Sequence, residues 1–457
     1  MQFGTGILLR GLPDYFIDQA NRRGVFKGRI LVVKSTSGSV EDFERHHCQF
    51  MTCVRGIHKG KKIEENILNT AISRVVSAQN LWPAVLAVAI SPDLQVIISN
   101  TTEVGIRFET ESIFQNPPAS FPGKLTAFLY ERFKKLEMNS PDLVIIPTEL
   151  VPDNGKKLID IVLKLSAHNE LEAGFEEWLS RKVIFCNSLV DRIVTKPSEM
   201  VQKMLRDASP LTIQVEPYKL WAIEGDERVK RILSFAGADQ DVIIASTIER
   251  YRERKLRILN GAGTVTASLG FMRGMDTFYQ CMQDKEMADY VEKVVLTEIE
   301  PTLPAATRED TRQFAIDVLE RWRNAYTVHR LLSITLQATA KMKMRNIPTV
   351  LRYVEQFKRL PDLLVQGFAA HLLFMKVVKK EGAQYFGSRR GELYPIQDDQ
   401  AEYFYGAWKG IDPDHKASLR SFVVKVCQDS ELWDSDLTAL PMFVETVTTH
   451  LNNLIRN

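Results

Sequence analysis

The sequence predicts an α/β fold class, with an N-terminal doubly wound parallel sheet followed by a mostly α-helical C-terminal domain. Short runs rich in Val and Ile alternate with helix-length segments through the first half of the chain. Such runs almost vanish in the second half. The 457 residues are also enough for two or three hydrophobic cores. We therefore expect two domains, residues 1–247 and 248–457.

The first half supplies the elements of the sheet. The expected strands are short apolar runs of the kind that parallel sheets bury on both faces: residues 29–34, 84–90, 95–99, 142–147, 183–186 and 242–246. The segments between them are long enough for helices: residues 9–23, 63–76, 122–136 and 156–167. Alternating strands and helices predict crossover connections that cover both faces of the sheet.

The second half has the character of a helical domain. Clusters of Gly, Pro and Asp mark the turns between segments that read as helices. The expected helices are residues 264–274, 287–299, 309–322, 328–344, 349–360, 363–378, 401–406, 418–427 and 440–455.

The composition excludes several functional classes. Lys and Arg number 59 and Asp and Glu number 57, so the net charge of +2 gives no basic surface for nucleic acid or an acidic membrane. Apolar residues at 45% and charged residues at 25% are typical of a soluble globular protein. The longest apolar run, residues 84–90, is too short to span a bilayer. We expect a cytoplasmic protein with a small-molecule partner, as a monomer or a dimer.

Cysteine usage fits a reducing compartment. The five cysteines are scattered, odd in number and not in a C-x-x-C pair, which argues against a disulfide framework. His46, His47, Cys48 and Cys53 lie close together, but their spacing matches no standard zinc pattern. We interpret them as a polar segment entering a strand, and we predict no metal site.

The chain opens with half of a dinucleotide fingerprint. In Gly4-Thr5-Gly6 the first Gly allows a tight turn, and the second lets the backbone approach a pyrophosphate at a helix N-terminus. Leu9 stands where the third Gly of the pattern would fall. Only residues 1–3 precede Gly4, fewer than the about five or six of an average strand. We expect that the first strand is truncated and that the native chain begins earlier.

Polar residues follow two of the expected strands. Lys34 ends the second strand, where an acidic residue usually binds the adenosine ribose. A cation there would tolerate a 2′-phosphate, so the residues leave NAD and NADP both open. Ligands of doubly wound folds bind outside the carboxyl ends of the strands, and capping of the next helix is the alternative role for such a segment. The cofactor-contacting run that we predict is Ser99, Asn100, Thr101, Thr102 and Glu103.

Lys255 and Asn260 are the candidate chemical groups. They lie five residues apart, somewhat more than one helical turn, at the expected start of the second domain. A partly buried Lys can act as a general acid or base near neutral pH, and an Asn amide can hold an oxygen on which negative charge develops. Together they suit reversible hydride transfer between an alcohol and a ketone. The alternative is a surface Lys and a helix-starting Asn.

These residues lie in motifs that resemble the mannitol dehydrogenase family of long-chain polyol dehydrogenases, including Lys255-x-Arg257-x-Leu259-Asn260-Gly261. The likeness runs along nearly the whole chain, through residues 2–10, 99–106, 124–133, 147–155, 185–193 and 255–261. Three further segments resemble the branch of that family that interconverts D-tagaturonate and D-altronate: residues 329–336, 391–399 and 432–437.

The resemblance implies an NAD-dependent reductase of bacterial hexuronate breakdown that works without a metal. It implies that Lys255 is the catalytic acid and base, and that Asn260 stabilises the developing alkoxide. It assigns Gly4, Gly6 and Arg10 to the cofactor-binding opening. The NAD preference of the family also argues against an NADP role for Lys34.

One position departs from the family motif. The family has a His, which assists at the reacting oxygen, where this sequence has Gly263. A Gly side chain cannot donate a hydrogen bond, and losing one positioned donor commonly costs about 100-fold or more in rate. Either another group such as His329 serves, or water fills the space, or the chain is impaired.

A hexuronate carries a carboxylate that a polyol lacks, so a cation should bind it. The candidates on or just after one expected helix are Arg330, Lys341, Lys343 and Arg345, with a solvated basic face as the alternative. Asn154 and His329 are further candidate substrate contacts. Other functions compatible with these residues are a fructuronate or mannitonate oxidoreductase, a polyol dehydrogenase, and a catalytically impaired NAD-binding relative.

Overall fold

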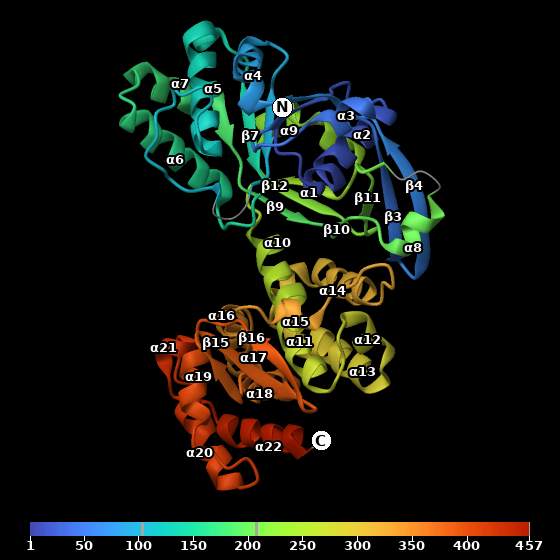
Figure 1. Cartoon of the computed structure of the whole chain (residues 1–457), viewed down its shortest axis with the longest axis vertical. Helices are drawn as coiled ribbons and strands as arrows, with labels where there is room; N and C mark the ends of the chain where they lie inside the picture. The colour runs from blue at the N-terminus through green and yellow to red at the C-terminus, as the bar shows by residue number, and fades with distance from the viewer. Residues whose placement is uncertain (102–104, 206–208, 457) are drawn as a thin grey trace. The chain divides into compact units, whose positions relative to one another are not determined.

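The computed structural model describes residues 1–101, 105–205 and 209–456. The chain divides into two compact units, Met1–Gly56 with Lys61–Tyr251 and Ile57–Gly60 with Arg252–Asn457. Figure 1 shows the first unit mainly in blue to green and the second mainly in yellow to red. Within the described ranges no helix is both long and apolar enough to cross a membrane.

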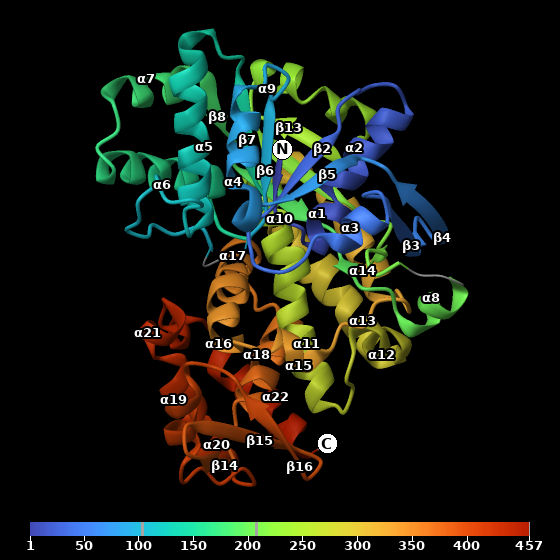
Figure 2. The ribbon, with the colours of Figure 1, turned by 45° about the horizontal axis from the view of Figure 1, so that its top comes forward.

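A six-stranded parallel sheet forms the centre of the first unit (Figure 2). Its order is β5-β2-β1-β6-β7-β8, which is the 3-2-1-4-5-6 order of a doubly wound Rossmann sheet. The predicted fold class is therefore confirmed. The strands are β1 (Gln2–Phe3), β2 (Ile30–Lys34), β5 (Ile72–Ser77), β6 (Val96–Ser99), β7 (Leu143–Pro147) and β8 (Val183–Phe185).

Both faces of this sheet are buried, because successive side chains of a strand point to opposite faces. One core contains Val32 and Ile98 together with residues of α1 and α2. The other contains Val33 and Ile97 together with residues of α5, α6 and α7. The bounds of these helices are Ile7–Gly11, Pro13–Arg22, Phe121–Leu136, Asn154–His168 and Ala173–Lys182.

The prediction of a helix over residues 63–76 is wrong. These residues form the strand β4 (Lys61–Asn69) and most of β5. Ile63 and Ile67 are spaced by four, a spacing that fits a helical face and also one face of a strand. The preceding strand β3 (Phe50–His58) turns into β4 through Lys59 and Gly60, both with positive φ, as a two-residue hairpin requires.

The prediction of a strand over residues 84–90 is also wrong. The run belongs to α4 (Ala78–Leu86) and the 3-10 helix η1 (Ala87–Ile90). Trp82, Val85 and Ala89 are buried at spacings of three and four, which is a helical pattern. A kink at Leu81 lets Pro83 sit near the start of a new helical turn, where Pro is tolerated.

Two smaller sheets complete the first unit, and only one of their strands was predicted from the sequence, at residues 242–246. The order of one sheet is β10-β11-β3-β4, and the order of the other is β13-β12-β9. Their remaining strands are β9 (Ser188–Asp191), β10 (Val194–Thr195), β11 (Ile213–Val215), β12 (Leu220–Glu224) and β13 (Val242–Ala245). The short helices α3 (Glu41–Arg45), α8 (Glu199–Met204) and α9 (Glu227–Ile232) connect them.

The second unit is mostly helical, as predicted. Its longer helices are α11 (Ala262–Met272), α13 (Lys285–Lys293), α14 (Arg308–Trp322), α17 (Ile347–Phe357), α18 (Asp362–Phe374), α19 (Ala401–Trp408), α20 (Lys416–Cys427) and α22 (Phe443–Arg456). Its short helices include α12 (Phe278–Gln283), α15 (Leu331–Ile334), α16 (Ala338–Lys341) and α21 (Ser430–Trp433). The helix α10 (Glu249–Arg254) leads into this unit.

Two features of this unit differ from the predictions. The expected helix over residues 328–344 is broken into α15, α16 and the start of a π-helix, because Gln337 adopts a left-handed conformation between them. A three-stranded sheet of β14 (Lys379–Glu381), β15 (Gln384–Arg389) and β16 (Glu392–Ile396) was missed. Most residues of these strands are at least partly exposed, so the strands contain no apolar run from which they could have been predicted.

Glu298 gives this unit a predicted pH dependence. It lies on the π-helix η6 (Val294–Ile299), and its carboxylate accepts the backbone N–H groups of Leu363 and Leu364 at 2.9 and 2.7 Å. Burial raises the pKa of Glu298 to about 7, against the lowering effect of these hydrogen bonds. The folded state therefore holds this proton more tightly than the unfolded state does.

The stability that protonated Glu298 contributes is fully present below about pH 4.5 and is lost as the pH rises through about 7. We expect the difference in unfolding free energy between wild type and Glu298→Gln to fall over that window, by on the order of 3 kcal/mol. Urea unfolding of both proteins across the window measures it. A difference that stays constant, or that rises with pH, would contradict this assignment.

Candidate functional site

Gly4 follows the end of β1 at the carboxyl edge of the central sheet. Its backbone N–H donates to the carbonyl of Val33 at 3.0 Å, and its φ is +122°. A Cβ added here would lie 3.0 Å from the carbonyl oxygen of Asn100 and from Leu9. Gly6 has no heavy atom within 4 Å of the equivalent position. The turn therefore requires a Gly at its first position and leaves open space at the second, as a dinucleotide cradle needs.

The segment after β6 is held by a buried carboxylate. Glu149 accepts hydrogen bonds from the hydroxyl of Ser99 at 3.2 Å and from the backbone N–H of Thr101 at 2.8 Å. Burial raises the pKa of Glu149, and these hydrogen bonds oppose the shift. Asn100 donates through its amide to the carbonyl of Thr148 at 3.2 Å. Glu149 lies within residues 147–155, one of the stretches that resemble the family, but nothing in the sequence indicated that it holds the segment after β6.

Other predicted cofactor residues differ in their placement. Arg10 is buried and donates to the carbonyl of Leu211. Its guanidinium also faces the rings of Phe43 and Phe50, so these contacts lie inside the first unit rather than at the predicted cofactor turn. Lys34 ends β2, with its ammonium 3.3 Å from the hydroxyl of Thr36. Thr102 and Glu103 lie outside the residues that the structure describes.

Asn154 is a predicted substrate contact that the fold itself uses. Its amide nitrogen lies 3.0 Å from the carbonyl oxygens of Pro147, Glu149 and Ser188. Its amide oxygen accepts from the backbone N–H groups of Gly155 and Ser188. The side chain therefore ties the end of β7 to β9, and its hydrogen-bonding capacity is filled.

A π-helix carries the candidate chemical groups. The segment η5 (Lys255–Gly261) is wound with i to i+5 hydrogen bonds and continues directly into α11. In an α-helix, residues five apart would point about 140° away from each other. In a π-helix, which has about 4.4 residues per turn, they point only about 50° away from each other. The π form therefore brings the half-buried Lys255 and Asn260 onto the same side of the helix.

A second π-helix, η9 (Met342–Asn346), binds the first one. Arg345 lies 3.5 Å from the carbonyl oxygen of Asn260 and 3.2 Å from the hydroxyl of Thr264. Among the residues that the structure describes, no carboxylate forms an ion pair with Arg345, and its Nε atom is buried without a partner. Burial lowers the pKa of Arg345, and both burial and Arg345 lower that of Lys341. This arrangement suits an anionic group of a ligand.

Residues 391–399 and 432–437, two of the segments that resemble one branch of the family, contact the segment that carries Lys341, Lys343 and Arg345. Asp398 accepts the backbone N–H of Thr339 at 2.8 Å. The ammonium of Lys343 lies 2.8 Å from Asp434 and donates to the carbonyl of Glu431 at 2.8 Å. Residues 391–399 and 432–437 therefore shape the segment that carries Lys341 and Arg345.

Gly263 lies in the first turn of α11, inside the core of the second unit. A Cβ added there would lie 3.7 Å from Trp322 and 3.8 Å from Phe278, which are ordinary contacts. On the same helix, a Cβ added at Gly270 would lie 2.6 Å from the sulfur of Cys281. The stacked rings of Phe278 and Trp322 border the position that holds a His in the family motif.

These contacts predict opposite effects of the same substitution. Gly263→Ala should raise the unfolding free energy by about 0.5–1 kcal/mol, because Ala restricts the unfolded chain and fits the site. Gly270→Ala should lower it by about 1–3 kcal/mol through overpacking. Denaturant unfolding of the two variants measures this difference. Destabilisation by Gly263→Ala would show that the space beside Trp322 is smaller than described.

His329 and Arg330 are placed differently from each other. The ring of His329 meets Phe278 edge-on at 6.3 Å, and its Nε2 atom is buried without a hydrogen-bond partner among the described residues. Burial, reinforced by Arg321, lowers the pKa of His329 to about 4, so the ring is neutral near pH 7. Arg330 is exposed. Of these two residues, only His329 packs against Phe278, one of the rings that border Gly263.

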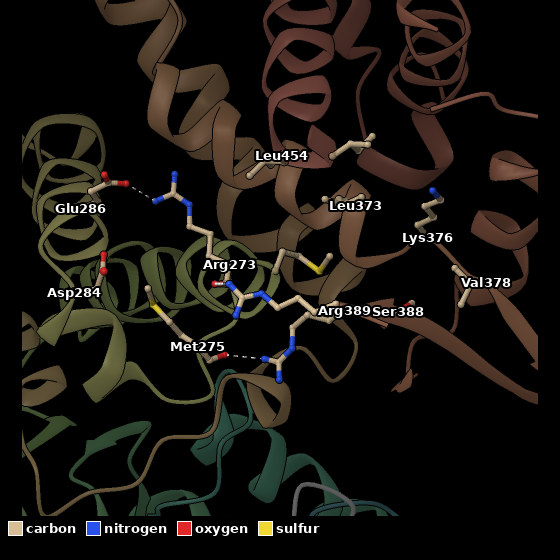
Figure 3. A pocket seen from close by; sticks show the side chains of 13 residues that line it. Arg273, Met275, Asp284, Glu286, Leu373, Lys376, Val378, Ser388, Arg389 and Leu454 are labelled. Atoms are coloured by element: carbon tan, nitrogen blue, oxygen red, sulfur yellow. Dashed lines mark hydrogen bonds and ion pairs between the residues drawn. The ribbon is translucent and has the colours of Figure 1, made fainter. Parts of the chain in front are cut away.

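A cavity of about 680 Å³ in the second unit has a different set of lining residues (Figure 3). Its lining includes the cations Arg273, Lys376, Arg389 and Arg390, and none of the predicted site residues. Arg389 donates to the carbonyl of Met275 at 3.1 Å and Arg390 to that of Arg273 at 3.1 Å. These two arginines therefore satisfy carbonyls at and beyond the end of α11, and the cavity is not part of the candidate site.

Comparisons with known proteins cover almost the whole chain. The mannitol dehydrogenase Rossmann domain matches residues 1–236, and the mannitol dehydrogenase C-terminal domain matches residues 247–455. The altronate oxidoreductase of Halalkalibacterium halodurans is 35% identical, covering 100% of this chain and 90% of the relative. That of Bacillus subtilis is 34% identical, covering 99% of this chain and 92% of the relative.

Two solved structures share the fold. Mannitol 2-dehydrogenase of Pseudomonas fluorescens, in a ternary complex with NAD and D-mannitol, has a TM-score of 0.67 at 20% identity. The match covers 100% of this chain and 94% of that one. A substrate-free D-sorbitol dehydrogenase has a TM-score of 0.76 at 18% identity, covering 98% of this chain and 94% of that one.

Proposed function

We propose a function from the premise that this chain belongs to the mannitol dehydrogenase family. It is an oxidoreductase, and we assign it the NAD(H)-dependent interconversion of D-tagaturonate and D-altronate. Altronate oxidoreductases match it along its full length at 35% and 34% identity. The observation in this chain that carries the substrate assignment is Arg345, a desolvated cation without a carboxylate partner among the described residues, beside the segment of Lys255 and Asn260.

The residues divide the chemistry among them. Bound NADH supplies the hydride that adds to the ketone carbon of the hexuronate. Lys255 gives its proton to the ketone oxygen as that oxygen becomes a hydroxyl, and it takes the proton back in the oxidative direction. The amide of Asn260 donates a hydrogen bond to the same oxygen while negative charge develops on it. Arg345, with Lys341 nearby, binds the substrate carboxylate.

The cofactor is assigned to the carboxyl edge of the central sheet. Gly4 makes the tight turn and Gly6 leaves the open space that a pyrophosphate needs, and Ser99, Asn100 and Thr101 lie on the neighbouring strand end. Lys34 stands where it could accept a 2′-phosphate, and the family preference for NAD argues against that role. Faster turnover with NADPH than with NADH would reverse this choice.

A panel of substrates tests the assignment. The purified protein is given NADH with D-tagaturonate, D-fructuronate or D-fructose, and NADH absorbance is followed. We expect kcat/KM for D-tagaturonate to exceed the other two by about tenfold or more. A higher value for D-fructuronate would contradict the assignment and identify the related oxidoreductase of the same family.

Gly263 supports a second candidate, an NAD-binding relative that has lost catalysis. The family motif has a His at this position, and the side chains nearest to Gly263 in this chain are the rings of Trp322 and Phe278. This candidate predicts measurable NADH binding without turnover of any hexuronate. The neutral ring of His329 is the group that could supply the missing donor, and loss of turnover in His329→Phe with intact NADH binding would identify it.

A further inference from the structure

The two π-helices exchange hydrogen bonds in both directions. From the first segment, the guanidinium of Arg257 donates to the carbonyls of Met344 and Arg345 at 2.8 and 2.9 Å. From the second, the amide of Asn346 donates to the carbonyl of Gly261 at 3.0 Å. We call this pair of contacts the clasp, formed by Arg257 and Asn346.

Both members of the clasp are buried. Arg257 is 8% exposed and Asn346 is 1% exposed. A buried main-chain carbonyl needs a donor, and water cannot replace these side chains readily. Glu253 anchors Arg257 with an ion pair of 2.9 Å. Burial would raise the pKa of Glu253, but its hydrogen bonds with Arg257 and Arg352 hold that pKa below its ordinary value.

We propose that Arg257 and Asn346 are positioning residues that hold residues 255–261 in the π form. The inference rests on the proposed function, because it gives that function the geometry it needs. Without the clasp, the segment can shift toward α-helical winding, which would place Asn260 about 140° around the helix axis from Lys255. A hydride acceptor then loses either its proton donor or its oxyanion contact.

The clasp also explains a departure from ordinary helix preference. Residues 255–261 and the helices on either side form one continuous helical stretch, in which α-helical winding would be the default. The side-chain donors of Arg257 and Asn346 stabilise the less common π winding. They reach their carbonyl acceptors only where residues 255–261 and 342–346 lie against each other. A π segment of this kind is frequent at functional sites.

Three variants of the full-length protein test this inference. Asn346→Ala removes the donor to Gly261, and Arg257→Met removes the donors to the second segment. Lys293→Met is the control, since it removes a cation from an exposed ion pair with Asp289, outside residues 255–261 and 342–346. Thermal unfolding first verifies that each variant is folded. Arg257→Lys provides a conservative rescue if Arg257→Met does not fold.

We expect kcat with D-tagaturonate to fall about 10- to 100-fold in both clasp variants, because the reacting groups lose alignment. KM for NADH should stay unchanged. The isotope effect with NADH deuterated at its transferable hydrogen should increase, since hydride transfer becomes the slow step. The control should match wild type in all three quantities. A purely structural role would lower the unfolding temperature without changing the isotope effect, and that result would overturn the inference.

Amide hydrogen exchange separates a failure of this inference from a failure of the proposed function. Exchange in a peptide covering residues 255–265 should speed up in both clasp variants and not in Lys293→Met. If wild type turns over no hexuronate, the proposed function fails, and the exchange result still decides whether the clasp holds the π form. Unchanged exchange in Asn346→Ala and Arg257→Met would overturn it.

Discussion

Lys255→Met should lower kcat about 1,000-fold with D-tagaturonate while leaving NADH binding intact. Met has a similar length but carries no proton, so the ketone oxygen must take its proton from water. General acid–base groups commonly contribute about 100- to 10,000-fold. Lys255 lies on a π-helix of the second unit, and the proposed cofactor residues all lie in the first. Steady-state kinetics and NADH fluorescence titration measure the two effects separately.

Chemical rescue sharpens this test of Lys255. Small primary amines should restore part of the activity of Lys255→Ala, because they can deliver a proton in the space that the side chain leaves. Lys293→Met is the control, since it removes a Lys from an exposed ion pair with Asp289. Retention of more than about a tenth of wild-type kcat in Lys255→Met would rule out Lys255 as the acid–base group.

Arg345→Met should lower kcat/KM for D-tagaturonate by about 100-fold or more. A desolvated charge pair typically loses 2–5 kcal/mol when one partner is truncated, and the substrate carboxylate would be that partner. The same variant should lower kcat/KM for D-fructose much less, because that ketose has no carboxylate and loses only the contacts of Arg345 with Asn260 and Thr264. The ratio between the two substrates therefore reports on carboxylate recognition alone.

Two further variants bracket the effect of Arg345. Arg345→Lys keeps the charge but loses the planar donor pair, so its loss should be intermediate. Lys293→Met removes a cation from the exposed ion pair with Asp289, and it should leave the ratio unchanged. An equal loss for D-tagaturonate and D-fructose in Arg345→Met would assign Arg345 to the structure of the segment rather than to the substrate.

The sheet was predictable where strands are buried on both faces. Residues 29–34, 95–99 and 142–147 are runs of Val and Ile that fit a parallel sheet and little else, and they form β2, β6 and β7. Residues 63–76 were predicted as a helix and form strands, and residues 84–90 were predicted as a strand and form helix. Their apolar residues fit both periodicities, and the hairpin turn at Lys59 and Gly60 decided the first case.

The candidate site was predictable only as a list of residues. The motif of Lys255 and Asn260 indicated the chemistry, but a spacing of five places them on opposite sides of an α-helix. The π-helix that brings them together depends on Arg257 and Asn346, which are 89 residues apart in sequence. Asn346 has no local signal. That no carboxylate of the described residues pairs with Arg345 is likewise a property of packing, so the sequence could not distinguish Arg345 from a cation on an exposed basic face.

A crystal structure of the protein with NADH and D-altronate would test the roles of Lys255, Asn260 and Arg345 together. We expect one hydroxyl of the substrate to lie within hydrogen-bonding distance of both the ammonium of Lys255 and the amide of Asn260. We also expect the substrate carboxylate to contact the guanidinium of Arg345. A substrate bound with its carboxylate away from Arg345, or with Lys255 out of reach of every hydroxyl, would contradict these roles.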